Sequence, residues 1–131
     1  MIAYASRTGN VRYIVSQIGL PGIEIGEETT VTEPFLLLTY TDGLGEVPPV
    51  VERFMERSGA YCRGVAVSGN RNFGHRLFGG AGDKIAERWN VPLVRRIELR
   101  GFRKDYEAIR RFCLEQVGEG SRHEIIFAAQ Q

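Results

Sequence analysis

The sequence predicts an α/β fold in which a five-stranded parallel β-sheet is covered by helices on both faces. Short strand-like apolar runs alternate along the chain with longer segments of helical periodicity, a pattern typical of parallel sheets with crossover helices. Residues 35–40 form the most apolar run, and its lack of polar alternation is typical of a central strand buried on both faces. Three polar, glycine-containing loops follow predicted strands, where open parallel sheets bind their ligands.

The first part of the chain contains two predicted strands and one helix. Residues 2–5 form a short buried strand. A helix follows from Asn10, which can cap its N-terminus, to Ile18, because apolar residues recur there with helical spacing. Residues 23–25 form a brief strand near an edge, and the polar, acidic residues 26–33 form a loop.

The middle of the chain is predicted to hold two neighbouring buried strands. Residues 35–40 form the first, and residues 41–46 form a loop by composition. Pro48 and Pro49 suit the first turn of the helix that follows. Residues 64–68 then form the next strand.

The C-terminal half is predicted to add a polar loop, two helices and the last strand. Residues 69–74 form the loop, and residues 77–89 form a helix whose first turn is left undefined by three glycines. Residues 93–99 form the strand. Apolar residues on one face predict a final helix over residues 104–117.

The step from the second strand to the third is unusual because no helix is predicted there. The loop is short for a parallel crossover, so either a small helix lies within it or the second strand is minor. Residues 118–131 have no assigned element, and their apolar residues 125–127 would add an edge strand or lie disordered. We expect one domain over residues 1–117 and an unassigned tail over residues 118–131.

The composition is that of a globular protein without a strong charge bias. A chain of 131 residues suits one domain, and its net charge of +1 lacks the basic excess typical of a nucleic-acid binder. Residues 1–60 hold 4 basic and 8 acidic side chains, whereas residues 61–131 hold 13 and 8. The basic half is either a set of solvated helix faces or part of a docking surface for an acidic protein partner.

The cysteine and histidine patterns disfavour disulfides and metal sites. Cys62 and Cys113 fit no metal-binding spacing, so we expect a reduced intracellular protein with buried thiols. His75 and His123 are the two histidines and show no ligand pattern. The N-terminus does not resemble a signal peptide, and no apolar stretch has the length of a membrane helix. We therefore expect a cytoplasmic protein without membrane contact.

The three loops offer the groups that a nucleotide needs. Residues 6–10 provide hydroxyls, an amide and a helix N-terminus, which can hold a phosphate, although the same side chains could simply cap the helix. Gly43 and Gly45 let the backbone of residues 41–48 approach a flat ligand closely, or form an ordinary turn. Residues 68–74 could hydrogen-bond and stack on a heteroaromatic ring, or pack on the core.

A flavin mononucleotide (FMN) fits the slot that these loops outline. The chain has no GxxxxGK[ST] motif and no GxGxxG motif after the first strand, which disfavours other nucleotide folds. A phosphoacceptor domain needs an aspartate after the third strand. Asp42 lies there, but the acidic pair that such a domain has after its first strand is missing. The sequence therefore disfavours a phosphoacceptor domain.

Several stretches resemble a known family. Residues 6–10 resemble the phosphate loop of flavodoxins. The more specific resemblance is to the NrdI proteins, and it covers residues 1 to about 117. It lies in residues 39–48 (TYTDGLGEVP), residues 64–74 (GVAVSGNRNFG), residues 81–86 (AGDKIA), the Val-Pro pair at 91–92, and residues 97–101 (IELRG).

The resemblance implies a flavodoxin-like three-layer α/β sandwich with strand order 2-1-3-4-5 and an FMN cofactor. The flavin would carry the chemistry, so no side chain need act as an acid or base. The cofactor-binding residues that it implies are Ser6, Arg7, Thr8, Gly9, Asn10, Tyr40, Thr41, Asp42, Gly43, Leu44, Gly45, Ser68, Gly69, Asn70, Asn72, Phe73 and Gly74. Residues 6–10 would bind the phosphate, residues 41–45 the ring near N5, and residues 68–74 its pyrimidine side.

The function that the resemblance implies is activation of class Ib ribonucleotide reductase. The reduced FMN protein would react with O₂ and pass superoxide or peroxide to the dimanganese site of the small subunit, where the tyrosyl radical forms. A thiol or flavin reductant protein would reduce it. The protein would then be an activator rather than a stand-alone enzyme.

Two other interpretations remain open. One is a general flavodoxin-type electron carrier, which commonly has a strongly acidic flavin site. Here Asp42 and Glu46 are accompanied by Arg7 and Arg71, and a near-neutral or positive field favours an anionic reduced flavin and superoxide. The other is a flavin-free binding module, for which the purified protein would lack absorbance near 450 nm and would not take up FMN.

Overall fold

The fold is one five-stranded, wholly parallel sheet, as the sequence predicts, with the strand order β2-β1-β3-β4-β5 that the family resemblance implies. The computed structural model describes residues 1–43, 45–71 and 78–118. The strands are β1 (Ile2–Tyr4), β2 (Gly22–Glu24), β3 (Phe35–Tyr40), β4 (Cys62–Gly69) and β5 (Leu93–Glu98). Residues 119–131 of the predicted tail and residues 72–77, which include the end of the third loop, lie outside the described residues.

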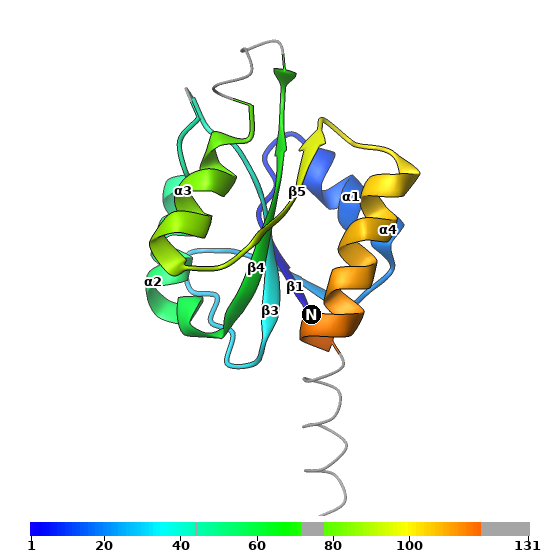
Figure 1. Cartoon of the computed structure of the whole chain (residues 1–131). Helices are drawn as coiled ribbons and strands as arrows, with labels where there is room; N and C mark the ends of the chain where they lie inside the picture. Colours follow the sequence, from blue (N-terminus) through cyan, green and yellow to red (C-terminus); the bar gives the residue numbers. More distant parts are fainter. Residues whose placement is uncertain (44, 72–77, 119–131) are drawn as a thin grey trace, which may run out of the picture.

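Helices cover both faces of the sheet (Figure 1), with α1 and α4 on one side and α2 and α3 on the other. Their bounds are α1 (Asn10–Ile18), α2 (Pro49–Ser58), α3 (Gly80–Trp89) and α4 (Arg103–Phe112), with a short 3₁₀ turn η1 (Gly59–Tyr61) after α2 and a π-helical segment η3 (Cys113–Gly118) after α4. The predicted final helix is therefore α4 together with η3. No helix in the described part of the chain is long and apolar enough to cross a membrane.

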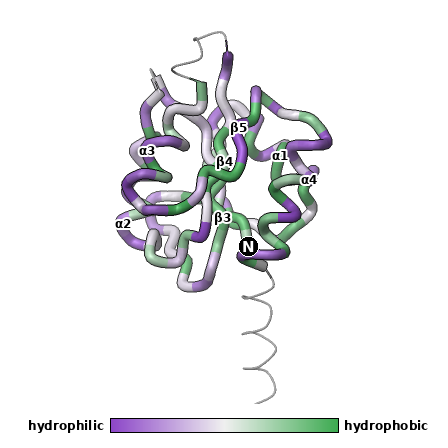
Figure 2. Tube along the Cα trace, in the orientation of Figure 1, coloured by the Kyte–Doolittle hydropathy of each residue, from purple (hydrophilic) through white to green (hydrophobic). Residues whose placement is uncertain are grey.

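The core forms on the two faces of β3, and this explains its continuous apolar sequence. Phe35 and Leu37 pack with residues of α2 and α3, whereas Leu36 and Leu38 pack with residues of α1 and α4. All four side chains are fully buried. In Figure 2 the helices alternate between hydrophobic and hydrophilic residues along their length, as expected when one side of each helix faces the sheet.

A loop connects β2 to β3 in place of a helix. Strand β2 is a three-residue edge strand whose partner in the described sheet is β1. The minor-strand alternative is therefore the one that holds. The loop is fastened to α2 instead of containing a helix of its own. The backbone N–H of Val31 donates to Ser58 Oγ at 2.9 Å, and Arg57 donates to the carbonyl oxygens of Gly26 and Thr29.

Several element boundaries differ from the prediction by a few residues, and two of them lie next to a residue with a positive φ, Gly79 before α3 and Leu99 after β5. Helix α3 begins at Gly80 instead of near residue 77. A Cβ atom on Gly80 would lie 3.0 Å from the Cα and carbonyl oxygen of Gly45, so a glycine is needed where the helix meets the loop after β3. Strand β5 ends at Glu98, because Leu99 turns the chain with a φ of 53°.

Candidate functional site

A cleft of about 730 Å³ lies at the carboxyl end of the sheet. Its volume is within the range of about 300–1,000 Å³ that is usual for ligand pockets. It adjoins the point where the strand order reverses between β1 and β3, the expected ligand position in an open α/β sheet. Its lining consists of Arg7, Thr8, Asn10, Val11, Tyr40, Thr41, Asp42, Gly43, Ser68, Gly69, Asn70 and Leu99.

Ten of these residues were predicted from the sequence, and the structure brings them together from three loops. Ser6, Gly9 and Gly45 are described but do not line the cleft. The predicted residues Leu44, Asn72, Phe73 and Gly74 lie outside the described residues. Sequence reasoning missed two lining residues: Val11 was assigned to the core stripe of a helix, and Leu99 to the end of a strand.

The loop after β1 leads into the N-terminus of α1. Gly9 is the N-cap residue with a φ of 93°, and it makes no side-chain cap hydrogen bond. Ser6 Oγ accepts a hydrogen bond from the N–H of Arg12 at 3.3 Å, so Ser6 does help to cap the helix. A Cβ on Gly9 would meet nothing within 4 Å. This open space at a helix N-terminus, with Thr8 and Asn10 lining the cleft, suits an anionic group such as a phosphate.

The loop after β3 is a closed turn that is tied to the first loop. Asp42 and Glu46 exchange two backbone hydrogen bonds of 2.8 and 2.7 Å, and Gly43 and Gly45 both have positive φ values. Arg7 Nη1 donates to Asp42 Oδ1 at 2.6 Å. The Arg7 guanidinium also lies 4.9 Å from the centre of the Tyr40 ring, so it joins the two walls of the cleft.

Hydroxyl-to-carbonyl bonds join the ends of β3, β4 and β5. Thr41 Oγ1 donates to the carbonyl oxygen of Ser68 at 3.4 Å, and Ser68 Oγ donates to that of Leu99 at 2.6 Å. The N–H of Leu99 donates to the carbonyl oxygen of Gly69 at 2.9 Å. Because Ser68 is only 3% exposed, its hydroxyl proton is used within the protein.

The cleft lining is electrically balanced. Arg7 and Asp42 are the charged residues among its described members, and they pair with each other. Two further charged residues that were predicted near the ligand do not line the cleft. Arg71 lines a neighbouring groove, where its Nε lies 4.0 Å from Glu98 Oε2. Glu46 lines a second cavity.

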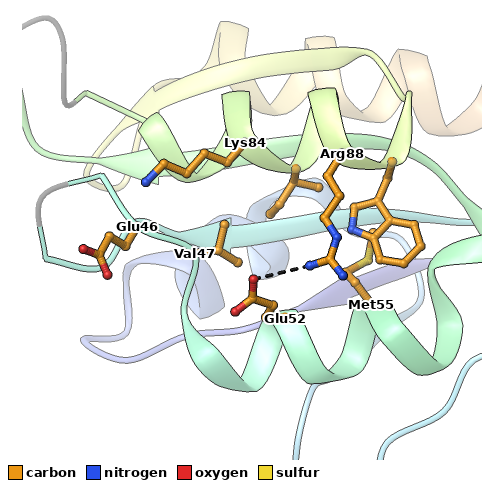
Figure 3. A pocket seen from close by; sticks show the side chains of 8 residues that line it. Glu46, Val47, Glu52, Met55, Lys84 and Arg88 are labelled. Atoms are coloured by element: carbon orange, nitrogen blue, oxygen red, sulfur yellow. Dashed lines mark hydrogen bonds and ion pairs between the residues drawn. The ribbon is translucent and has the colours of Figure 1, made fainter.

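The second cavity, of about 230 Å³, lies between α2 and α3. Figure 3 shows Lys84 and Arg88 of α3 above Glu52 of α2, with Arg88 Nη1 3.3 Å from Glu52 Oε1. Val47 and Met55 lie between the two helices. This cavity is separate from the cleft, because no residue lines both.

The described residues contain no group of three or more His, Cys, Asp or Glu that could hold a metal ion. His75 and His123 lie outside the described residues. Cys62 and Cys113 are both free and buried. Burial raises the pKa of each thiol to about 11, so neither is a reactive thiolate at neutral pH.

Comparison with known proteins identifies both the family and the fold. Residues 2–111 match the family model described as NrdI flavodoxin-like. A short-chain flavodoxin associated with a non-canonical PDU bacterial microcompartment has a similar structure, with a TM-score of 0.67 and 20% identity over 92% of this chain and 96% of that one. Oxidised flavodoxin 1 from Bacillus cereus aligns with a TM-score of 0.56 and 20% identity over 85% of this chain and 91% of that one.

Proposed function

The chain belongs to the NrdI flavodoxin-like family, whose members bind FMN, and from this premise we propose that it activates class Ib ribonucleotide reductase. When reduced, the protein supplies superoxide or peroxide for assembly of the dimanganese-tyrosyl radical cofactor of the reductase small subunit. We extend the proposal to the domain: residues 1–117 form the FMN-binding unit, and residues 118–131 are a tail without an assigned role.

The residues of the cleft fit FMN. The open space beside Gly9 and the polar side chains of Thr8 and Asn10 would hold the phosphate at the start of α1. The loop after β3, with Thr41, Asp42 and Gly43, would approach the ring, and Gly69 and Asn70 at the end of β4 would approach its other side. The remaining predicted residues, including Asn72 and Phe73, belong to the same proposal.

The chemistry that FMN supplies is electron transfer to O₂: one electron gives superoxide, and two electrons with two protons give hydrogen peroxide. The electrons come from a thiol or flavin reductant protein. The protein's own residues hold the cofactor and set the local field. Two free, buried cysteines favour a reducing compartment, so we place this function in the cytoplasm.

The observation that carries the proposal beyond a general electron carrier is the charge balance of the cleft. The two charged residues in the described part of its lining, Arg7 and Asp42, form an ion pair. An acidic site would oppose both an anionic reduced flavin and the formation of superoxide beside it. A balanced site opposes neither, which favours reaction with O₂.

The test combines the FMN-loaded, reduced protein with a Mn²⁺-loaded class Ib small subunit and O₂, and measures the tyrosyl radical by electron paramagnetic resonance. We expect the radical with the reduced protein but not with the oxidised protein or with free reduced FMN. Absence of the radical, together with efficient electron delivery to a redox protein under anaerobic conditions, would support the electron-carrier alternative instead.

A further inference from the structure

Leu99 has an unusual backbone conformation for its residue type. Its φ of 53° lies in the left-handed region, which residues other than glycine, asparagine and aspartate rarely adopt. Among the described non-glycine residues it shares a positive φ only with Asn90, an asparagine that caps the C-terminus of α3. Leu99 caps no helix, so a different cause is needed.

The turn that contains Leu99 is fixed from both sides. Toward β4, the carbonyl oxygen of Leu99 accepts a hydrogen bond from Ser68 Oγ at 2.6 Å, and the N–H of Leu99 donates to the carbonyl oxygen of Gly69 at 2.9 Å. Toward α4, Tyr106 donates from its hydroxyl to the carbonyl oxygen of Arg100 at 2.6 Å. Gly101 closes the turn with its own φ of 71°. Ser68 and Gly69 therefore bond directly to Leu99, and Tyr106 and Gly101 fix the two residues that follow it.

Folding does not use the Leu99 side chain for the core. The residue is 45% exposed, although leucine is among the residue types that are most often buried. It lines the cleft, whereas the other aliphatic lining residue, Val11, is 1% exposed. The strained turn thus presents an exposed apolar side chain inside a ligand-sized cleft, and backbone strain of this kind concentrates at functional sites.

We propose that Leu99 contacts the flavin ring, and that the strained turn holds it there as an apolar wall of the cleft. This inference rests on FMN binding within the proposed function. An aliphatic side chain recognises the ring system and not the phosphate. The β5–α4 turn is therefore a fourth flavin-binding segment, on the opposite side of β4 from Thr41 and Asp42.

The experiment compares two substitutions at Leu99 with the same two at Asn90. The variants are Leu99→Ala, Leu99→Gly, Asn90→Ala and Asn90→Gly, and the measurements are the Kd values for FMN and riboflavin and the melting temperature of the apoprotein. Both Leu99 variants should bind FMN and riboflavin about five- to tenfold more weakly, because an apolar contact with the ring is lost. Both Asn90 variants should bind them within about twofold of the wild type.

The apoproteins test the strain separately. At each position the glycine variant should melt about 3 °C or more above the alanine variant, because glycine adopts a positive φ without steric cost. Equal melting temperatures of Leu99→Gly and Leu99→Ala would show that the backbone at residue 99 is not strained.

Wild-type affinity for both flavins in the two Leu99 variants would show that Leu99 does not contact the ring. Weaker binding of FMN with unchanged binding of riboflavin would also contradict the proposal, because the lost interaction would then involve the phosphate. A wild-type protein that takes up no FMN would instead defeat the proposed function itself.

Discussion

Arg7 and Asp42 form a hydrogen-bonded ion pair, with Arg7 Nη1 2.6 Å from Asp42 Oδ1, that joins the loop after β1 to the loop after β3. Both side chains are partly open to solvent, at 56% and 35% exposure. Pairs this exposed contribute little to folding stability. Because both residues also line the cleft, we expect the pair to matter more for a bound flavin than for the fold.

Asp42→Asn should raise the midpoint potential of bound FMN. The substitution removes the anion and leaves Arg7 uncompensated, and the added positive field stabilises a reduced, anionic flavin. We expect a rise of roughly 20–40 mV, with a change in the free energy of unfolding of about 0.5 kcal/mol or less. A spectroelectrochemical titration measures the potential.

The matched control is Asp83→Asn, which removes an aspartate that also pairs with an arginine, Arg96, but lies outside the cleft. Its potential should stay at the wild-type value. An unchanged or lower potential in Asp42→Asn would contradict the electrostatic effect that we assign to Asp42.

Gly9→Ala should weaken FMN binding, because Gly9 is the N-cap of α1 and has a φ of 93°. A Cβ there meets nothing within 4 Å, so the cost is conformational and not steric, roughly 1–2 kcal/mol. The backbone relaxes by turning the first amides of α1 away from the phosphate, and we expect about a tenfold rise in the FMN Kd. Fluorescence titration of the apoprotein measures it.

Gly19→Ala provides the comparison at the other end of the same helix. Gly19 is the C-cap of α1 with a φ of 74°, and the nearest atom to a Cβ there is 3.6 Å away. The two variants should lose similar stability, but Gly19→Ala should keep the wild-type FMN affinity. Equal FMN affinities in both variants would contradict the prediction that the phosphate binds at the start of α1.

The sequence predicted the fold because its strongest signals are local. The continuous apolar run of β3 needs two covered faces, and the run is buried on both. Three of the cleft loops were predictable because polar residues and glycines directly follow strands. The position of Leu99 in the cleft was not predictable, because its conformation depends on hydrogen bonds to Ser68 and Gly69, about thirty residues earlier in the chain. The start of α3 was likewise not predictable, because three glycines leave it undefined in the sequence and the structure alone shows the left-handed φ of Gly79 at the N-cap.

Asp105→Ala should strongly destabilise the turn between β5 and α4. Asp105 Oδ1 accepts from Arg95 Nε at 2.8 Å, and Oδ2 accepts from the N–H of Phe102 at 2.7 Å, at the start of α4. The carboxylate is 9% exposed, so its loss removes a helix cap and leaves Arg95 without this partner. We expect a loss of about 2–4 kcal/mol in the free energy of unfolding, measured with urea.

Glu107→Ala is the control on the same helix. Glu107 pairs with Arg103 four residues earlier, and both side chains are largely exposed. Its removal should cost about 0.5 kcal/mol or less. Similar losses in the two variants would mean that the Asp105 contacts add nothing beyond a surface ion pair.

Cys62 and Cys113 should make the fold sensitive to alkaline pH. Burial raises the pKa of both thiols from 9.0 to about 11 in the folded protein. The folded pKa lies above the unfolded one, so the stabilisation is fully present below pH 9 and is lost as the pH rises to about 11. Each thiol should contribute up to roughly 2–3 kcal/mol to this loss.

Urea unfolding at pH 8, 9, 10 and 11 measures the loss of stability. Cys62→Ala should have a smaller pH dependence than the wild type. Ser58→Ala, at another buried residue that does not titrate, should lower stability equally at every pH. A pH dependence in Cys62→Ala as steep as that of the wild type would contradict the assignment to the thiol.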